Sequence, residues 1–209
     1  MVVWLNTTGD VLNDTQQAAF EGFIQSGGGY VGVHSATDTE YDWPWYGQLI
    51  GNNAWFQNHP FIQEAHLDVE IGDHPSTQHL GSGEFTEEWY NFRENPRPVV
   101  DVLVTLDETT YSGGTMGDHP ISWCHEFQGG RSWYTGMGHR TQTFQSVGFQ
   151  QHLLGGILWA SAAGATPVPA FSTIALGVLT VAVAAIGLLM LRNVDKGLAR
   201  TPAREQTLE

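Results

Sequence analysis

The opening of the chain constrains the fold most, because two apolar runs flank one helical pattern. The runs are VVWLN at residues 2–6 and YVGV at residues 30–33. Between them, residues 14–25 place apolar side chains at helical spacing, Asn13 or Asp14 can cap the helix, and three glycines follow it. A strand, a helix and a strand in so short a stretch predict a βαβ unit, in which helices cover parallel strands.

Four later patterns extend this sheet. AHLDVEI at 65–71 and VVDVLVTL at 99–106 alternate as half-exposed strands do. Residues 120–138 predict a hairpin about a Gly-Gly turn, and residues 149–162 predict a last amphipathic helix. Together these patterns predict an α/β domain over residues 1–163, with a doubly wound, mostly parallel sheet.

The composition changes near residue 164. Residues 164–169 form a short Pro- and Ala-containing linker, and residues 170–191 contain no ionisable side chain. About 20 apolar residues suffice for a helix to cross a bilayer, so this segment predicts a transmembrane helix. The tail at 192–209 carries the basic residues that flank the span, which are Arg192, Lys196, Arg200 and Arg204. The positive-inside rule then predicts a single-pass membrane protein with its C-terminus in the cytoplasm and its main domain outside.

The charge of the chain excludes one class of partner. There are 22 acidic residues against 8 basic ones. A surface this acidic repels the phosphate backbone, so we expect no nucleic-acid partner. The balance suits a polar neutral substrate, a cation or a salty exterior, and the alternative is that it serves solubility alone. The single cysteine, Cys124, allows no disulfide within the chain.

Two histidines follow predicted strands, at the edge where ligands of open α/β sheets bind. His34 comes directly after YVGV with Ser35 beside it, and His139 follows the second strand of the predicted hairpin. Histidine titrates near neutral pH and suits proton transfer. Together with Glu40, in the loop after His34, and Glu88, before an aromatic run, they form a candidate catalytic set. The alternative for each is local turn chemistry or a solvated acid.

Candidate substrate-binding residues lie next to this set. Trp43, Trp45 and Tyr90 offer aromatic faces on which sugar rings can stack, and Ser35 offers a hydroxyl. Arg131 could clamp a carboxylate. The alternatives are core packing for the aromatic residues and pairing with an acid for the arginine.

A metal site is a further hypothesis, although the sequence holds no HExxH motif or paired histidines at helical spacing. A site of histidines and carboxylates assembled from several loops would suit zinc best. Its candidate ligands are His34, His59 and His125.

Five longer segments resemble the ThuA-like, or trehalose-utilisation, domain family. They are NTTGDVLND, GGGYVGVHSATDTEYDWPWYGQLIG, EEWYNFRENPR, LDETTYSGGTMGDHPISW and GGRSWYTGMGH, and they span residues 1–162 in order. The resemblance implies a fold similar to class I glutamine amidotransferases. Those enzymes carry a catalytic cysteine at a strand–helix elbow, where this chain has His34 and Ser35. The resemblance therefore argues against a Cys-dependent glutaminase, and it makes His139 the counterpart of the family fold's later histidine.

The resemblance also implies a substrate class, which is trehalose, related disaccharides or their keto forms. The family domain begins with further elements before VVWLN, so we expect the chain to be incomplete at its N-terminus and to lack its signal peptide. Two hypotheses follow. One is a membrane-anchored, extracytoplasmic enzyme that acts on carbohydrate by acid–base or metal-assisted chemistry, and the other is a non-catalytic carbohydrate-binding module of the cell surface.

Overall fold

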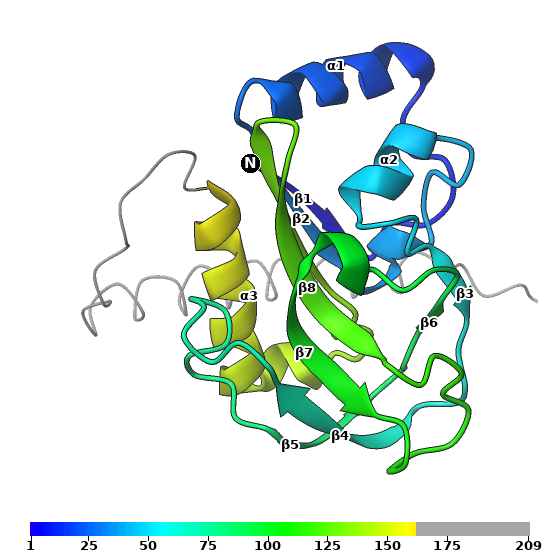
Figure 1. The fold of residues 1–209 in the computed structure, drawn as a ribbon, viewed down its shortest axis with the longest axis vertical. Coiled ribbons are helices and arrows are strands. Elements are labelled where there is room, and N and C mark those ends of the chain that lie inside the picture. The colour runs from blue at the N-terminus through cyan, green and yellow to red at the C-terminus, as the bar shows by residue number, and fades with distance from the viewer. Residues whose placement is uncertain (162–209) are drawn as a thin grey trace, which may run out of the picture. The chain divides into compact units, whose positions relative to one another are not determined.

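The computed structural model of the protein describes residues 1–161 (Figure 1). The predicted linker, membrane helix and tail at 164–209 lie outside these residues. Within residues 1–161, none of the helices combines the length and the apolar character needed to cross a membrane.

Seven strands form one sheet in the order β1-β2-β9-β8-β7-β4-β5, and β3 pairs with β6 in a small second sheet. The strands are β1 (Val2–Leu5), β2 (Gly29–Val33), β3 (Phe56–Asn58), β4 (Gln63–Val69), β5 (Gly83–Glu87), β6 (Asn91–Phe92), β7 (Asp101–Asp107), β8 (Pro120–Phe127) and β9 (Gly130–Thr135). The helices of residues 1–161 are α1 (Asp14–Gln25), α2 (Pro44–Leu49) and α3 (Val147–Ser161), with short 3-10 turns η1 (His34–Thr37), η2 (Arg97–Val99) and η3 (Thr143–Gln145).

The expectation of a mostly parallel sheet is wrong. In the seven-stranded sheet of residues 1–161, only the β1–β2 and β2–β9 pairs are parallel, whereas β9–β8, β8–β7, β7–β4 and β4–β5 are antiparallel. The physical reason is connection length, since parallel neighbours need a long crossover and antiparallel ones do not. The chain has such a crossover in α1, but β8 and β9 are joined by a tight turn at Gln128 and Gly129.

The predicted βαβ unit is confirmed. Asn13 caps α1 in a capping box, because its side chain accepts from the Gln16 amide while the Gln16 side chain accepts from the Asn13 amide. The helix buries Phe20 and Ile24, and the Phe20 ring lies 5.5 Å from that of Trp4. The helical spacing seen in the sequence therefore marks the face that packs on the sheet.

Helices cover both faces of the parallel part, because successive side chains of a strand point to opposite faces. Tyr30 of β2 points to the face that carries α2, where its hydroxyl lies 2.7 Å from the Tyr46 hydroxyl. Trp133 of β9 points to the other face, against α3. A Cβ on Gly156 of α3 would lie 2.3 Å from the Trp133 indole, so only glycine lets the helix approach this closely.

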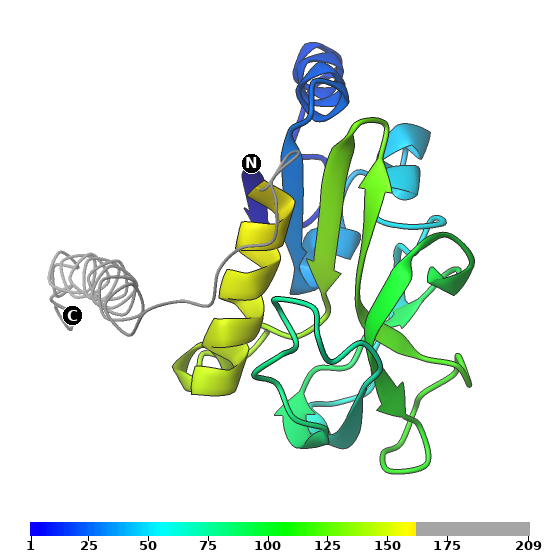
Figure 2. The ribbon, with the colours of Figure 1, turned by 60° about the vertical axis from the view of Figure 1, so that its left-hand side comes forward.

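The seven-stranded sheet is curled, and the curl brings the residues of the candidate site together. β1, β2 and β9 run parallel and end at the same edge, so the residues that follow them lie together. β5 lies at the opposite end of the strand order, yet the Glu87 carboxylate at its end accepts from the His139 amide in the loop after β9. Figure 2 shows the same strands from a second direction. Residues far apart in the sequence thereby meet at one place.

Candidate functional site

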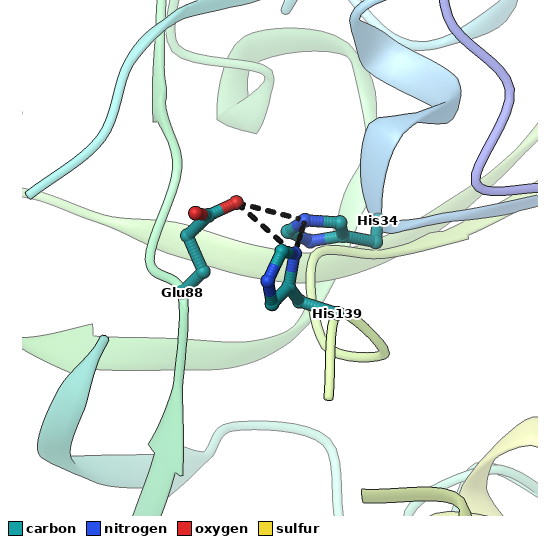
Figure 3. A group of neighbouring side chains, drawn as sticks. All are labelled: His34, Glu88 and His139. Carbon is teal, nitrogen blue, oxygen red and sulfur yellow. Dashed lines mark hydrogen bonds and ion pairs between the residues drawn. The ribbon is translucent and has the colours of Figure 1, made fainter. Parts of the chain in front are cut away.

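Three side chains from three separate segments converge at the strand-end edge (Figure 3). His34 Nε2 lies 3.2 Å from Glu88 Oε2 and 3.2 Å from His139 Nδ1. His139 Nδ1 lies 3.3 Å from the same Glu88 oxygen. We call His34, Glu88 and His139 the strand-end cluster. All three were predicted from the sequence as candidate catalytic residues, and the structure brings them into mutual contact.

His34 is held in one orientation. It follows β2 directly and opens η1 with a φ of 49°, a left-handed conformation that is uncommon outside glycine. Its Nδ1 lies 2.9 Å from the Gly136 carbonyl, which can only accept, so Nδ1 carries the proton. Burial lowers the pKa of His34, which favours the neutral ring. The Nε2 lone pair of that ring points at Glu88 and His139.

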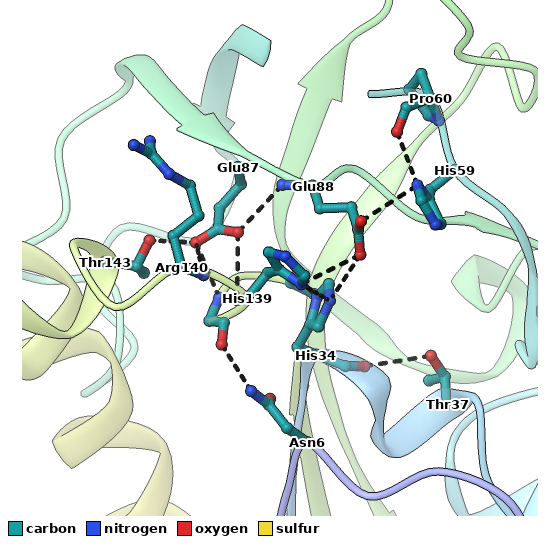
Figure 4. Close-up of polar contacts among 12 residues, drawn as sticks. Asn6, His34, Thr37, His59, Pro60, Glu87, Glu88, His139, Arg140 and Thr143 are labelled. Atoms are coloured by element: carbon teal, nitrogen blue, oxygen red, sulfur yellow. Dashed lines mark hydrogen bonds and ion pairs between the residues drawn. The ribbon is translucent and has the colours of Figure 1, made fainter. Parts of the chain in front are cut away.

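The loop that carries His139 is held by Glu87, a fully buried carboxylate that the sequence patterns do not single out (Figure 4). Its oxygens accept from the backbone amides of Gly138, His139 and Arg140 at 3.2–3.4 Å and from the Thr143 hydroxyl. Neighbouring residues of an extended chain point in opposite directions. The adjacent pair Glu87 and Glu88 could therefore have signalled one carboxylate for the site and one for its support.

Tyr90 forms a wall of the strand-end cluster. Its ring centroid lies 4.2 Å from that of His34 and 4.2 Å from that of Phe56. The ring is 5% exposed and stacks on His59 at 5.8 Å. Tyr90 thus contacts the cluster, but its ring is packed against protein side chains and is not an open platform for a sugar.

One side of the cluster is open to solvent. The side chains of His139 and His59 are each 40% exposed, whereas that of Glu88 is 13% exposed. His59 Nδ1 lies 3.3 Å from Glu88 Oε1, the carboxylate oxygen that does not contact His34. A ligand could therefore reach Glu88 and His139 from the side of His59.

Glu40, the fourth predicted catalytic residue, is not brought to the cluster. It is buried, and its carboxylate accepts from the Val11 and Leu12 amides and from the Gln17 side chain at 2.7–2.8 Å. These contacts fasten the segment before α1. Ser35 does lie beside His34 in η1, where it is buried and its carbonyl accepts from the Asp38 amide.

Two predicted sugar-stacking residues pack elsewhere. Trp43 donates to Glu21 of α1, and Trp45 donates to Gln128 in the β8–β9 turn. The two indoles stack on each other at 5.2 Å, Trp43 also stacks on Tyr46, and Trp45 meets Phe127 edge to face. They belong to the packing between α1, α2 and the hairpin, which was the alternative interpretation.

Arg131 and His125 also lie away from His34. Arg131 is the second residue of β9, at the opposite end of the strand from His139, and donates to the Trp159 carbonyl at 3.1 Å. His125 of β8 donates to the Leu49 carbonyl at 2.8 Å. The predicted metal set of His34, His59 and His125 is therefore not assembled. Among residues 1–161, the only group of three or more possible ligand side chains with mutual distances below 4.8 Å is the strand-end cluster.

Cys124 lies in β8 and is buried. Burial raises the pKa of its thiol to about 12, and the sulfur lies 3.7 Å from His74 Nε2. A reactive cysteine needs the opposite, a lowered pKa that favours the thiolate. Cys124 therefore has the properties of a structural core residue.

Comparison with known proteins identifies the family to which this site belongs. Residues 1–160 match the family described as ThuA, trehalose utilisation. The chain belongs to the ThuA family. A search of curated proteins finds no match.

Two solved structures support the ThuA fold. A ThuA-like protein from Bacteroides uniformis ATCC 8492 is 28% identical, with a TM-score of 0.64, and the match covers 74% of this chain and 67% of that one. A ThuA-like protein from Parabacteroides merdae ATCC 43184 is 23% identical, with a TM-score of 0.65, over 82% of this chain and 74% of that one. These likenesses confirm the predicted ThuA-like α/β domain.

Proposed function

We propose that the ThuA domain acts on a carbohydrate of the trehalose or keto-disaccharide class, and that the strand-end cluster is its reaction centre. The observation that carries the proposal is the convergence of His34 Nε2, His139 Nδ1 and Glu88 Oε2 at the carboxyl ends of parallel strands. The family description, trehalose utilisation, supports the substrate class. The acidic composition suits an uncharged sugar.

The cluster is suited to moving a proton of a sugar hydroxyl or to holding a metal that polarises it. Either chemistry uses the Nε2 lone pair of His34, which the bond from Nδ1 to Gly136 directs into the cluster. Glu88 would stabilise the positive charge that forms on either histidine. The half-exposed His139 faces the side from which a substrate would arrive.

The proposal is tested by turnover of trehalose and 3-keto-disaccharides by the wild type, Glu88→Gln and Glu84→Gln. The last is the matched control, since Glu84 is an exposed carboxylate on β5 that pairs with His66. We expect Glu88→Gln to lower kcat/KM by about 100-fold or more and Glu84→Gln to leave it unchanged. Sugar binding without turnover in the wild type would instead support a non-catalytic carbohydrate-binding module.

We also propose that the domain is displayed outside the cytoplasm on a single membrane helix. The support is the uncharged stretch at 170–191 and the basic residues after it. Fractionation of cells that produce the full protein tests this. Recovery in the membrane fraction with protease-sensitive ThuA domain on intact cells is expected, and a protein released by a salt wash contradicts it.

A further inference from the structure

We propose that the strand-end cluster binds a divalent transition metal, with zinc the best-suited ion, through His34 Nε2, His139 Nδ1 and Glu88 Oε2. This ligand set differs from the one that the sequence suggested, because it replaces His59 and His125 by His139 and Glu88. The inference deepens the proposed function, since it names the chemistry of the same site. Its direct test is binding of the metal alone, which does not depend on turnover.

The spacing of the three atoms is the first support. They lie 3.2, 3.2 and 3.3 Å from one another. In a tetrahedral site with bonds of about 2.0–2.1 Å, neighbouring ligand atoms lie about 3.3–3.4 Å apart. The three atoms therefore already occupy the corners of one face of such a tetrahedron. Two histidines and one carboxylate are also a donor set that zinc and its neighbours in the first transition row accept.

The proton on His34 is the second support. Because Nδ1 donates to the Gly136 carbonyl, the neutral ring presents only a lone pair at Nε2. That lone pair faces a carboxylate oxygen at 3.2 Å. Two acceptors this close repel each other unless a metal cation or a proton lies between them. A histidine ligand whose other ring nitrogen donates to a backbone carbonyl is the usual arrangement at protein metal sites.

The surroundings hold all three ligands in place. The Tyr90 ring packs on the His34 ring at 4.2 Å, and the Glu87 carboxylate holds the backbone of the His139 loop. Glu87 also accepts from the Glu88 amide at 3.1 Å. One buried carboxylate thereby supports the segments of two ligands. Such supporting contacts orient ligands and raise metal affinity.

The open side supplies the remaining coordination position. Three protein ligands and one open position are typical of catalytic zinc sites, whereas structural sites use four protein ligands. His139 is 40% exposed, so the open position faces solvent. A metal there would act as a Lewis acid on a sugar hydroxyl or keto oxygen. His59, which contacts the other oxygen of Glu88, lies where it can bond to the bound sugar or to Glu88.

Titration of the chelator-treated full chain with Zn²⁺ by calorimetry, and with Co²⁺ by visible absorption, tests the proposal. We expect one Zn²⁺ per chain and the absorption bands of low-symmetry Co²⁺. Loss of an outer contact weakens metal affinity by about 10- to 100-fold. The variants His139→Ala, His34→Ala and Glu88→Gln each change a proposed ligand and should weaken Zn²⁺ binding by more than this.

His66→Ala is the matched control, because His66 is a histidine beside two acids, Glu84 and Asp68, on the exposed side of the sheet. It should retain full binding. Should His34→Ala fail to fold by circular dichroism, His139→Ala keeps the test decisive, since its side chain is half exposed. Absence of stoichiometric binding by the wild type, or equal binding by His139→Ala, would overturn the metal site. Turnover that resists complete metal removal would contradict the Lewis-acid role of the metal while leaving the proposed function in place, whereas metal binding without turnover supports the site and contradicts the proposed function.

Discussion

Two groups of side chains in this domain are each centred on a buried histidine, and these histidines, His34 and His152, differ in what their ring nitrogens face. In the strand-end cluster, His34 Nε2 faces a carboxylate and a second histidine. On the buried face of α3, His152 Nδ1 donates to the Ser76 carbonyl at 2.8 Å and Nε2 lies 3.2 Å from the Thr135 hydroxyl. Neutral protein groups therefore satisfy both nitrogens of His152, while His34 keeps one nitrogen directed at charged and titratable partners.

The comparison teaches that burial does not separate a functional histidine from a structural one. His34 is 2% exposed and His152 is fully buried, and burial lowers the pKa of both. What separates them is the chemical nature of the groups that the second ring nitrogen faces, and whether solvent reaches those groups. The predictions below test this distinction by changing each group in turn.

The largest expected effect on stability comes from His152→Ala. Its loss leaves a cavity between α3 and Trp133 and removes the partner of the Ser76 carbonyl. We expect the free energy of unfolding to fall by about 3 kcal/mol or more. Urea unfolding measures this, and Zn²⁺ affinity measured below the transition should stay at the wild-type value. A large drop in metal affinity would show that His152 also contributes to the metal site, contrary to the distinction between it and the strand-end cluster.

Acid should destabilise the domain through His152 on the buried face of α3. Burial lowers the pKa of His152 to about 4, whereas an unfolded histidine has a pKa of about 6.5. The unfolded state therefore binds more protons between these values, so stability is fully present above pH 6.5 and is lost as the pH falls towards 4. The loss for this one residue is about 3 kcal/mol. Unfolding of the wild type and of His152→Leu across this range checks it, since the variant should have a flatter profile.

Glu87→Gln should lower both the stability of the domain and its affinity for Zn²⁺. The amide places an NH₂ group among backbone donors and removes the charge that four backbone amides contact. We expect a loss of about 2 kcal/mol in the free energy of unfolding, together with weaker Zn²⁺ binding because the His139 loop is no longer held. Glu87→Gln with unaltered metal affinity would show that the loop is positioned by other contacts.

The smallest effect is expected for His66→Ala. His66 pairs with Glu84 at 2.8 Å on the surface, and exposed ion pairs contribute little. The free energy of unfolding should stay close to that of the wild type. A thermal melt beside the wild type is sufficient, and a shift comparable to that of His152→Ala would mean that exposure is not what makes this histidine dispensable.

Local patterns predicted the elements well, because capping, spacing and turn residues act within a few positions. Asn13 as a cap, the β8–β9 hairpin and α3 all follow from such patterns. The antiparallel pairing of the later strands does not follow from local patterns, because it depends on which distant segments of the chain meet. The strand β5 shows no strong alternation and was not predicted at all.

The candidate site likewise contains residues that local patterns predict and excludes others that the same patterns suggested. His34 and His139 could be predicted because residues that follow parallel strands share one edge. Glu40 and Trp45 are close to His34 in the sequence, but a positive φ at Glu40 and the packing of α2 turn their side chains towards α1 and the hairpin. Side-chain direction after a strand end is set by tertiary contacts, which a sequence pattern does not encode.

The most direct measurement is turnover of a 3-keto-disaccharide by His139→Ala at a temperature where its circular dichroism matches the wild type. The strand-end cluster as reaction centre predicts a fall in kcat/KM of about 100- to 10,000-fold with a melting temperature close to that of the wild type, because the side chain is half exposed. Wild-type turnover by His139→Ala would contradict it.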